Sequence, residues 1–95
     1  MTAGAAAPVM IVADVPGQDR AGYDAMRRAL GDVLRRAPGL ILHTAHPVAE
    51  GWRVVEVWET KREADRFFAD EVASRLPAGI RPKRSVVELH AVVGR

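Results

Sequence analysis

The segment GWRVVEVW, which begins at Gly51, places a carboxylate between two tryptophans on one face of a predicted strand. Alternate side chains of a strand point to the same face, so Glu56 shares its face with Trp52, Val54 and Trp58. A carboxylate on an apolar face is costly to bury without a partner, and enzymes use such groups as general acids or bases. Glu56 is therefore a candidate catalytic residue. The alternative is a structural ion pair with a helix arginine or with the neighbouring strand.

The histidines are the next candidates, because imidazole changes its charge near neutral pH. His43 and His46 lie on opposite faces of one predicted strand, since their separation is odd. If His46 and Gly51 close a four-residue hairpin loop, His43 lies opposite Val54 and joins the tryptophan-bearing face. A loop one residue longer would place Thr44 and His46 there instead. We favour the shorter loop and expect His43 to be a catalytic base, with a hydrogen-bonded sheet histidine or a dimer-interface histidine as the alternative.

His90 follows Glu88 by two residues, so the two share a face of the last predicted strand. Such a pair could relay a proton, or hold a metal ion if a third ligand converged on it. A solvent-facing or interfacial pair is the commoner arrangement, so we expect no metal site. The chain has no cysteine, which excludes disulfides and thiolate nucleophiles. It also lacks the motifs of serine hydrolases, phosphate loops, zinc helices and dinucleotide-binding folds.

The aromatic side chains are expected to converge between the helices and the sheet; they are Tyr23, Trp52, Trp58, Phe67 and Phe68. As a plain core they need no function. As the walls of a pocket they would stack a flat, apolar, aromatic ligand that a few polar groups orient. We take these five residues, together with His46 and His90, as candidate substrate contacts.

The elements that must position these residues follow the order βαββαβ. Asp19 is placed to cap a helix that runs to about residue 36, and Thr60 with Glu63 forms a capping box for a second helix. Strands are expected over residues 9–15, 40–46, 51–59 and 85–93. Right-handed crossovers then predict a ferredoxin-like α+β fold, a four-stranded antiparallel sheet with both helices on one face. Residues 1–7 are expected to be a disordered lead, and residues 8–95 a single domain.

The second face of the predicted sheet is also apolar, because Val55 and Val57 alternate with Val54 and Trp58. No segment remains to cover it, so we expect a two-fold homodimer that buries this face.

The net charge of +2 is mild, and the only basic cluster without acids is Arg81, Lys83 and Arg84. The cluster lacks the interleaved aromatic residues of a nucleic-acid site, so no nucleic-acid partner is expected, while contact with an anionic ligand stays open. No apolar run approaches the length of about 20 residues that a membrane span needs. The absence of cysteines and of a signal-peptide pattern suits a cytoplasmic protein.

The stretch APGLILHTAHPVAEGWRVVEVWETKREADRFF resembles the core of the antibiotic biosynthesis monooxygenase superfamily, within the dimeric α+β barrel proteins. The sharpest points of the resemblance are Pro38-Gly39 and Trp58-Glu59-Thr60 followed by an aromatic-bearing helix. The superfamily includes cofactor-free oxygenases of polyketide phenols, quinol oxygenases, heme-degrading enzymes and cyclases. The resemblance therefore implies a dimeric barrel that binds a small aromatic substrate.

The resemblance carries over to few reactive positions. In the anthrone oxygenases a tryptophan of the third strand lines the cavity, and Trp58 matches it. Their companion asparagine, four residues earlier, is Val54 here, and their helical tyrosine falls near Ala64. Heme-degrading members use a histidine on the second helix, and the plant-type cyclases use a tyrosine and a histidine on and after it. Residues 60–76 contain none of these.

We expect a homodimeric monooxygenase that needs no cofactor and acts on a polyketide-like phenol, anthrone or quinol. His43 or Glu56 would remove a phenolic proton, the anion would pass an electron to O2, and Trp58 would position the ring. One alternative is a cyclase or isomerase in which the same base forms an enolate. Another is a non-catalytic dimer that binds a small molecule or a partner protein, and heme degradation is the third.

Overall fold

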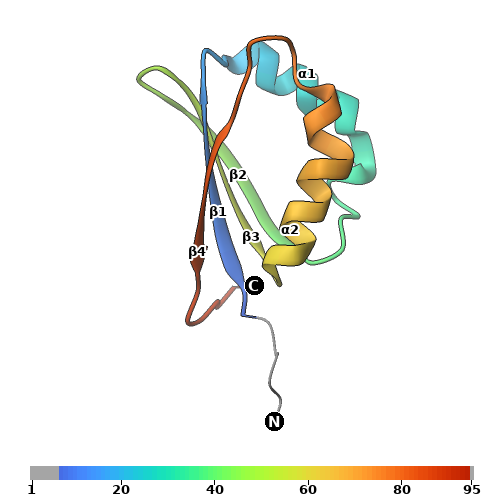
Figure 1. Ribbon diagram of the computed structural model, residues 1–95, viewed down its shortest axis with the longest axis vertical. Helices are drawn as coiled ribbons and strands as arrows, with labels where there is room; N and C mark the ends of the chain where they lie inside the picture. Colours follow the sequence, from blue (N-terminus) through green and yellow to red (C-terminus); the bar gives the residue numbers. More distant parts are fainter. Residues whose placement is uncertain (1–6, 95) are drawn as a thin grey trace.

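The computed structural model of the chain describes residues 7–94 and has two helical segments packed on one face of a sheet (Figure 1). The four antiparallel strands lie in the order β2-β3-β1-β4. Their bounds are β1 Val9–Pro16, β2 Leu40–Val48, β3 Gly51–Trp58 and β4 Lys83–Glu88. The expected ferredoxin-like α+β fold is confirmed. The predicted lead over residues 1–7 lies, apart from Ala7, outside the described residues.

The buried face of the sheet is built by the two central strands, because alternate residues of both strands are apolar. In β1 these are Val9, Ile11 and Val15, and in β3 they are Trp52 and Trp58, all buried. The antiparallel register pairs Val9 with Trp58 and Val15 with Trp52. Between these two pairs, Glu56 of β3 lies opposite Ile11. A carboxylate thus stands near the middle of the sheet's apolar face.

The hairpin between β2 and β3 is tighter than the sequence predicts. Val48 pairs with Gly51, so the loop is Ala49-Glu50 alone, and His43 lies opposite Glu56 and not opposite Val54. Pro47 is accommodated within β2 because β2 is an edge strand, where a missing N–H does not break a ladder on both sides. The register moves by two residues, which preserves the face, so His43 is on the buried side of the sheet.

The first helix, α1, spans Arg20–Leu30 and is shorter than predicted. Asp19 caps it, since its Oδ1 accepts a hydrogen bond of 2.8 Å from the N–H of Gly22. Gly31 ends it with a positive φ of 55°, a conformation that glycine adopts without steric cost, and a 3-10 turn, η1 Gly31–Val33, follows. The predicted continuous helix to residue 36 is therefore wrong at its end.

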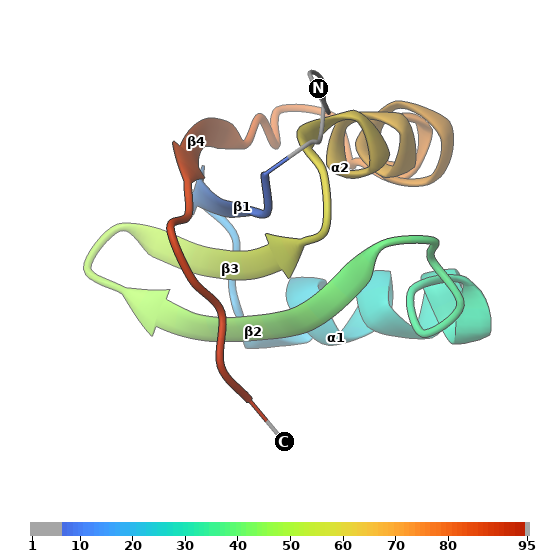
Figure 2. The ribbon, with the colours of Figure 1, turned by 90° about the horizontal axis from the view of Figure 1, so that it is seen from below.

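The second helical segment changes its winding along its length. The α-helix α2 spans Lys61–Phe67, a π-helical turn η2 covers Phe68–Val72, and a 3-10 turn η3 covers Ala73–Arg75. Single π turns inside helices are frequent at functional sites. Phe67 packs against Trp58 with ring centroids 5.5 Å apart, whereas Phe68 lies against Arg84. Seen from below, α2 lies toward the β4 side of the sheet and α1 toward the β2 side (Figure 2).

The two motifs that carried the family resemblance meet in space at the start of α2. Thr60 Oγ1 accepts from the N–H of Glu63 at 3.1 Å and donates to Glu63 Oε1 at 2.9 Å. The carbonyl of Gly39 accepts a bond of 2.7 Å from the N–H of Glu59. Gly39 has a φ of 86°, and a Cβ there would lie only 2.3 Å from Glu63 Oε1. A glycine is required because the capping carboxylate packs directly on the backbone.

The last strand is displaced from its predicted position. It begins at Lys83 and ends at Glu88, whereas residues 85–93 were expected. β4 pairs only with β1, and the ladder ends where Glu88 meets Val9, the first residue of β1. His90 therefore lies beyond the sheet. Across the described part of the chain, no helix is both long and apolar enough to cross a membrane.

The opposite face of the sheet carries no helix (Figure 1). Alternation directs Met10, Val12, Val55 and Val57 toward it from the central strands, and the edge strands add further exposed apolar side chains. Leu42 is 53% exposed and Val87 is 44% exposed. No helix within residues 7–94 packs over this apolar face.

We predict that the Thr60 cap contributes measurably to stability. Replacing Thr60 by Ala removes the acceptor for the Glu63 N–H, so the free energy of unfolding should fall by about 1 kcal/mol. Urea unfolding measures this change, and Thr60→Ser, which keeps the hydroxyl, is the matched control. Equal stability of the Ala and Ser variants would show that the cap contributes nothing.

Candidate active site

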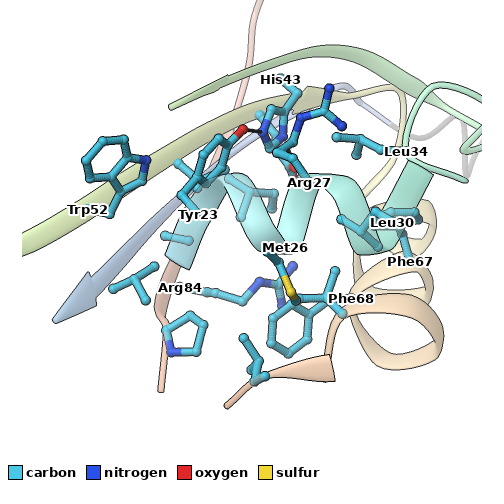
Figure 3. A pocket seen from close by; sticks show the side chains of 18 of the residues that line it. Tyr23, Met26, Arg27, Leu30, Leu34, His43, Trp52, Phe67, Phe68 and Arg84 are labelled. Carbon is cyan, nitrogen blue, oxygen red and sulfur yellow. Dashed lines mark hydrogen bonds and ion pairs between the residues drawn. The ribbon is translucent and has the colours of Figure 1, made fainter. Parts of the chain in front are cut away.

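A cavity lies between the helices and the buried face of the sheet (Figure 3). Most of its lining is apolar and comes from every layer of the fold: Ile11, Ala13, Val15, Met26, Leu30, Leu34, Val54, Ala64, Phe67, Phe68, Val72 and Leu76. A few polar groups interrupt this surface, chiefly Tyr23, Arg27, His43, Glu56 and Arg84. The cavity volume is about 100 Å³. An apolar enclosure with a few convergent polar groups is the usual form of a small-molecule site.

A continuous chain of hydrogen bonds connects four side chains at this cavity. Tyr23 Oη lies 2.6 Å from His43 Nε2, and His43 Nδ1 lies 2.6 Å from Glu56 Oε2. The indole N–H of Trp58 donates to the other oxygen, Glu56 Oε1, at 3.0 Å. An ionised Glu56 accepts from both neighbours, which leaves Nε2 of a neutral His43 to accept the Tyr23 hydroxyl. Every group in the chain is then satisfied.

The local structure explains why these groups meet. His43 and Glu56 are directly paired across β2 and β3, so their side chains leave the sheet side by side on the same face. Each side chain is only 16% exposed. Trp58 is two residues further along the same face, and Tyr23 reaches down from α1. The partner of the Glu56 carboxylate is thus a residue of the neighbouring strand, not an arginine of a helix.

Tyr23 is held between two other rings. Its ring plane is within 16° of that of His43 and within 24° of that of Trp52, with centroids 6.0 Å and 5.8 Å away. Burial raises the pKa of Tyr23 above its ordinary value of 10.0; Arg27 opposes this shift, and the charge of Glu56 adds to it. The phenol is therefore protonated at neutral pH and donates to His43.

Trp52 contributes a polar group that nothing in the described chain satisfies. The side chain is buried, and its Nε1 has no hydrogen-bond partner among residues 7–94. Figure 3 shows the indole nitrogen on the side of the ring that faces Tyr23. A buried donor without a partner costs about 1–3 kcal/mol. An unsatisfied buried group of this kind calls for a physical explanation, such as a functional role or an acceptor supplied by a water molecule.

Three of the predicted site residues lie outside the cavity lining. Trp58 is fully buried behind Glu56, against Ala64 and Phe67, so it supports the cavity from the core and does not line it. His46 is exposed on the outer face of β2, where its Nδ1 lies 2.9 Å from the carbonyl oxygen of Pro47.

His90 is exposed beyond the end of β4 and is also absent from the lining. Among the described residues, no group of three or more His, Cys, Asp or Glu side chains is placed to hold a metal ion.

The structure also brings in residues that sequence reasoning missed. Arg27 was not among the predicted site residues, yet it lines the cavity one turn after Tyr23. That spacing of four residues was the available signal. Arg84 was noted only as part of a basic cluster, and its position opposite Ala13 on the buried face depends on the β1–β4 register.

Comparison with known proteins supports the fold. No protein-family model and no curated protein matches the chain. SnoaB from Streptomyces nogalater, a cofactor-independent oxygenase solved in a mutant form, is similar with a TM-score of 0.69 and 16% identity, covering 95% of this chain and 100% of that chain.

The heme-degrading protein Rv3592 from Mycobacterium tuberculosis, solved heme free, gives a TM-score of 0.60 and 20% identity, covering 95% and 99% of the two chains. Both structures support the predicted ferredoxin-like α+β fold of this chain. At these identities the likeness concerns the fold alone.

The raised pKa of Tyr23 predicts a specific dependence of stability on pH. The stabilisation of the protonated phenol is complete below pH 10, the unfolded-state value, and is lost as the pH rises through the higher folded-state pKa. The chain has a single tyrosine, so tyrosinate absorbance reports this residue alone. We expect the native protein to titrate at higher pH than the denatured chain. Coincident titration curves would contradict the burial of the phenol.

Proposed function

We propose that the protein is a monooxygenase that needs no cofactor and acts on a small phenolic aromatic molecule, a phenol, quinol or anthrone. The observation that carries this proposal is the Tyr23–His43–Glu56–Trp58 hydrogen-bond chain at an apolar cavity. The similarity of the fold to a cofactor-independent oxygenase agrees with it. The hydrogen bonds between these side chains would orient a general base, and the apolar walls of the cavity would accommodate a flat aromatic ring.

The His43–Glu56 pair is the proton acceptor in this mechanism. Glu56 holds the Nδ1–H of His43 and stabilises the imidazolium that forms when Nε2 takes a proton. In the free protein Nε2 already accepts from Tyr23. A ligand hydroxyl that bonds to Tyr23 Oη gives up its proton as Tyr23 passes its own proton to His43. The raised pKa of Tyr23 suits a group that transmits a proton without remaining ionised.

The oxidation then takes place on the ligand. The phenolate is electron-rich and transfers one electron to O2, and the phenoxyl radical and superoxide then combine at a ring carbon that carries a hydrogen atom. The His43 imidazolium returns its proton through Tyr23, which completes the hydroperoxide. Loss of water from the hydroperoxide leaves a carbonyl group. One oxygen atom of O2 enters the product, and the other leaves as water.

Cavity size orders the substrates to be tested. An apolar cavity of about 150 Å³ holds one benzene molecule. The cavity of about 100 Å³ therefore admits a ring only when side chains at its edge move. A single-ring hydroquinone requires the smallest rearrangement, and a three-ring anthrone requires movement of long side chains such as Met26. Hydroquinones are accordingly the first substrates to test.

A second candidate function is a cyclase or isomerase that uses the same base. The unpartnered indole N–H of Trp52 favours it, because an enolate oxygen formed in the cavity would need a buried donor. In that reaction the His43–Glu56 pair removes a proton from carbon, and no oxygen is consumed.

Oxygen uptake by the metal-stripped protein tests the proposed function. With hydroquinones and anthrones, His43→Ala and Glu56→Gln should each lower the rate by about a hundredfold or more, since general-base catalysis contributes that much. His46→Ala is the matched control, a histidine on the same strand that faces away from the cavity.

Absence of uptake with the whole panel would reject the oxygenase. Proton exchange at an acidic ligand carbon, lost in the same two variants, would then identify the cyclase or isomerase. Ligand binding without either reaction would leave a binding protein.

We also propose that the protein is a homodimer in which two copies bury their bare sheet faces. The support is the apolar outer face, with Leu42 53% exposed and Val87 44% exposed. Leu42→Glu together with Val57→Glu should halve the mass measured by light scattering from twice the 10.3 kDa chain to one chain. Val33→Glu, at an exposed valine of η1, is the control. A monomeric unmodified protein would contradict the proposal.

A further inference from the structure

Arg84 enters the cavity from β4. It lies opposite Ala13 in the β1–β4 ladder, so its side chain leaves the sheet on the buried face. Its guanidinium carbon is 4.4 Å from the centre of the Phe68 ring, and its side chain is only 22% exposed. Figure 3 shows the guanidinium between Met26 and the Phe68 ring. Stacking on an aromatic face thus holds a permanent positive charge at a defined position.

The charge of Arg84 is only weakly compensated by its neighbour. Its Nη1 lies 3.5 Å from Asp65 Oδ1, a long contact for an ion pair. The other oxygen of Asp65 is 2.5 Å from Lys61 Nζ, and Lys61 is the main reason that the pKa of Asp65 is lowered. One carboxylate therefore serves two cations. The guanidinium keeps further N–H donors for another acceptor.

A second arginine gives the cavity the same sign of charge. Arg27 lines the cavity from α1, and no ion pair to it is found within residues 7–94. Among the described lining residues the single carboxylate is Glu56, whose two oxygens are engaged by His43 and Trp58. Two arginines against one engaged carboxylate, within low-dielectric walls, attract an anion.

We propose that Arg84 is a carboxylate-binding residue of this cavity and that the ligand is a hydroxylated aromatic carboxylic acid. The carboxylate binds the planar fork of Arg84 through two parallel N–H···O bonds, a geometry that guanidinium and carboxylate share. The ring of the ligand then lies along the apolar wall, with its hydroxyl directed to Tyr23. The placement of the hydroxyl rests on the proposed function, whereas the binding of the acid does not.

Calorimetric titration without oxygen tests the inference, because binding is then measured apart from turnover. The probes are 2,5-dihydroxybenzoate and its methyl ester, which differ by the charge. The acid should bind the unmodified protein about tenfold or more tightly than the ester, as expected for a charge-assisted contact. Arg84→Gln should remove most of that preference by lowering the affinity for the acid, and Arg84→Lys should keep only part of it because lysine lacks the fork.

Arg81→Gln is the matched control, since Arg81 is an exposed arginine of the preceding loop and does not line the cavity. Equal affinity of the unmodified protein for acid and ester, or binding of neither, would overturn the inference without any variant. An equal loss in Arg81→Gln would overturn it as well. Tighter binding of the acid than of the ester, without oxygen uptake, would support this inference and reject the oxygenase. Oxygen uptake with neutral hydroquinone, without tighter binding of the acid, would support the oxygenase and reject this inference.

Discussion

The arrangement of this site depends on one constraint, the partial burial of the Glu56 carboxylate on the apolar face of a sheet. A charge in that position is tolerated only when each oxygen has a donor. His43 serves one oxygen and Trp58 serves the other. Trp58 in turn is the most completely buried large side chain of the described core and packs on Phe67 of α2. The core of the protein therefore orients this carboxylate.

The sheet and the helices contribute different side chains to the site. The sheet holds the hydrogen-bonded pair in place, because His43 and Glu56 are paired across the β2–β3 ladder. The helices supply the groups that approach a ligand, Tyr23 from α1 and Phe68 from the π-helical turn. Sheet residues thus hold the hydrogen-bonded pair, and helix residues form part of the cavity wall. A change of ligand preference is thus compatible with an unchanged base.

Sequence periodicity predicted the fold and the face of the sheet to which each side chain points. It did not predict how deeply a side chain is buried, or which residues pair between strands far apart in the sequence. Alternation placed Glu56 and His43 on one face, and the prediction survived a hairpin that was two residues shorter, since the shift was even. Alternation could not show that Trp58 lies behind the cavity, because the depth of a side chain depends on the helix packed above it.

Other features depended on contacts between segments far apart in the sequence. The end of β4 was mispredicted because it is set by where β1 begins, and Arg84 joined the cavity through that same pairing. The bond from Tyr23 to His43 joins a helix to an edge strand, and helical spacing alone does not specify which strand residue it meets. The missing acceptor of Trp52 is likewise visible only when all neighbours are placed.

The hydrogen bond from Tyr23 to His43 has a consequence for selectivity. In the free protein, the base is occupied by the protein's own phenol. In the proposed reaction, a ligand hydroxyl passes its proton to Tyr23, which already carries one, as Tyr23 passes its own proton to His43. The pKa of the ligand hydroxyl relative to that of Tyr23 therefore decides whether the transfer is favourable. Because burial raises the pKa of Tyr23, the proposed proton transfer favours hydroxyls at least as acidic as a phenol over aliphatic alcohols. Under the proposed function, Tyr23 is thus an internal reference acid, and a hydroxyl that holds its proton much more tightly than this phenol is not deprotonated.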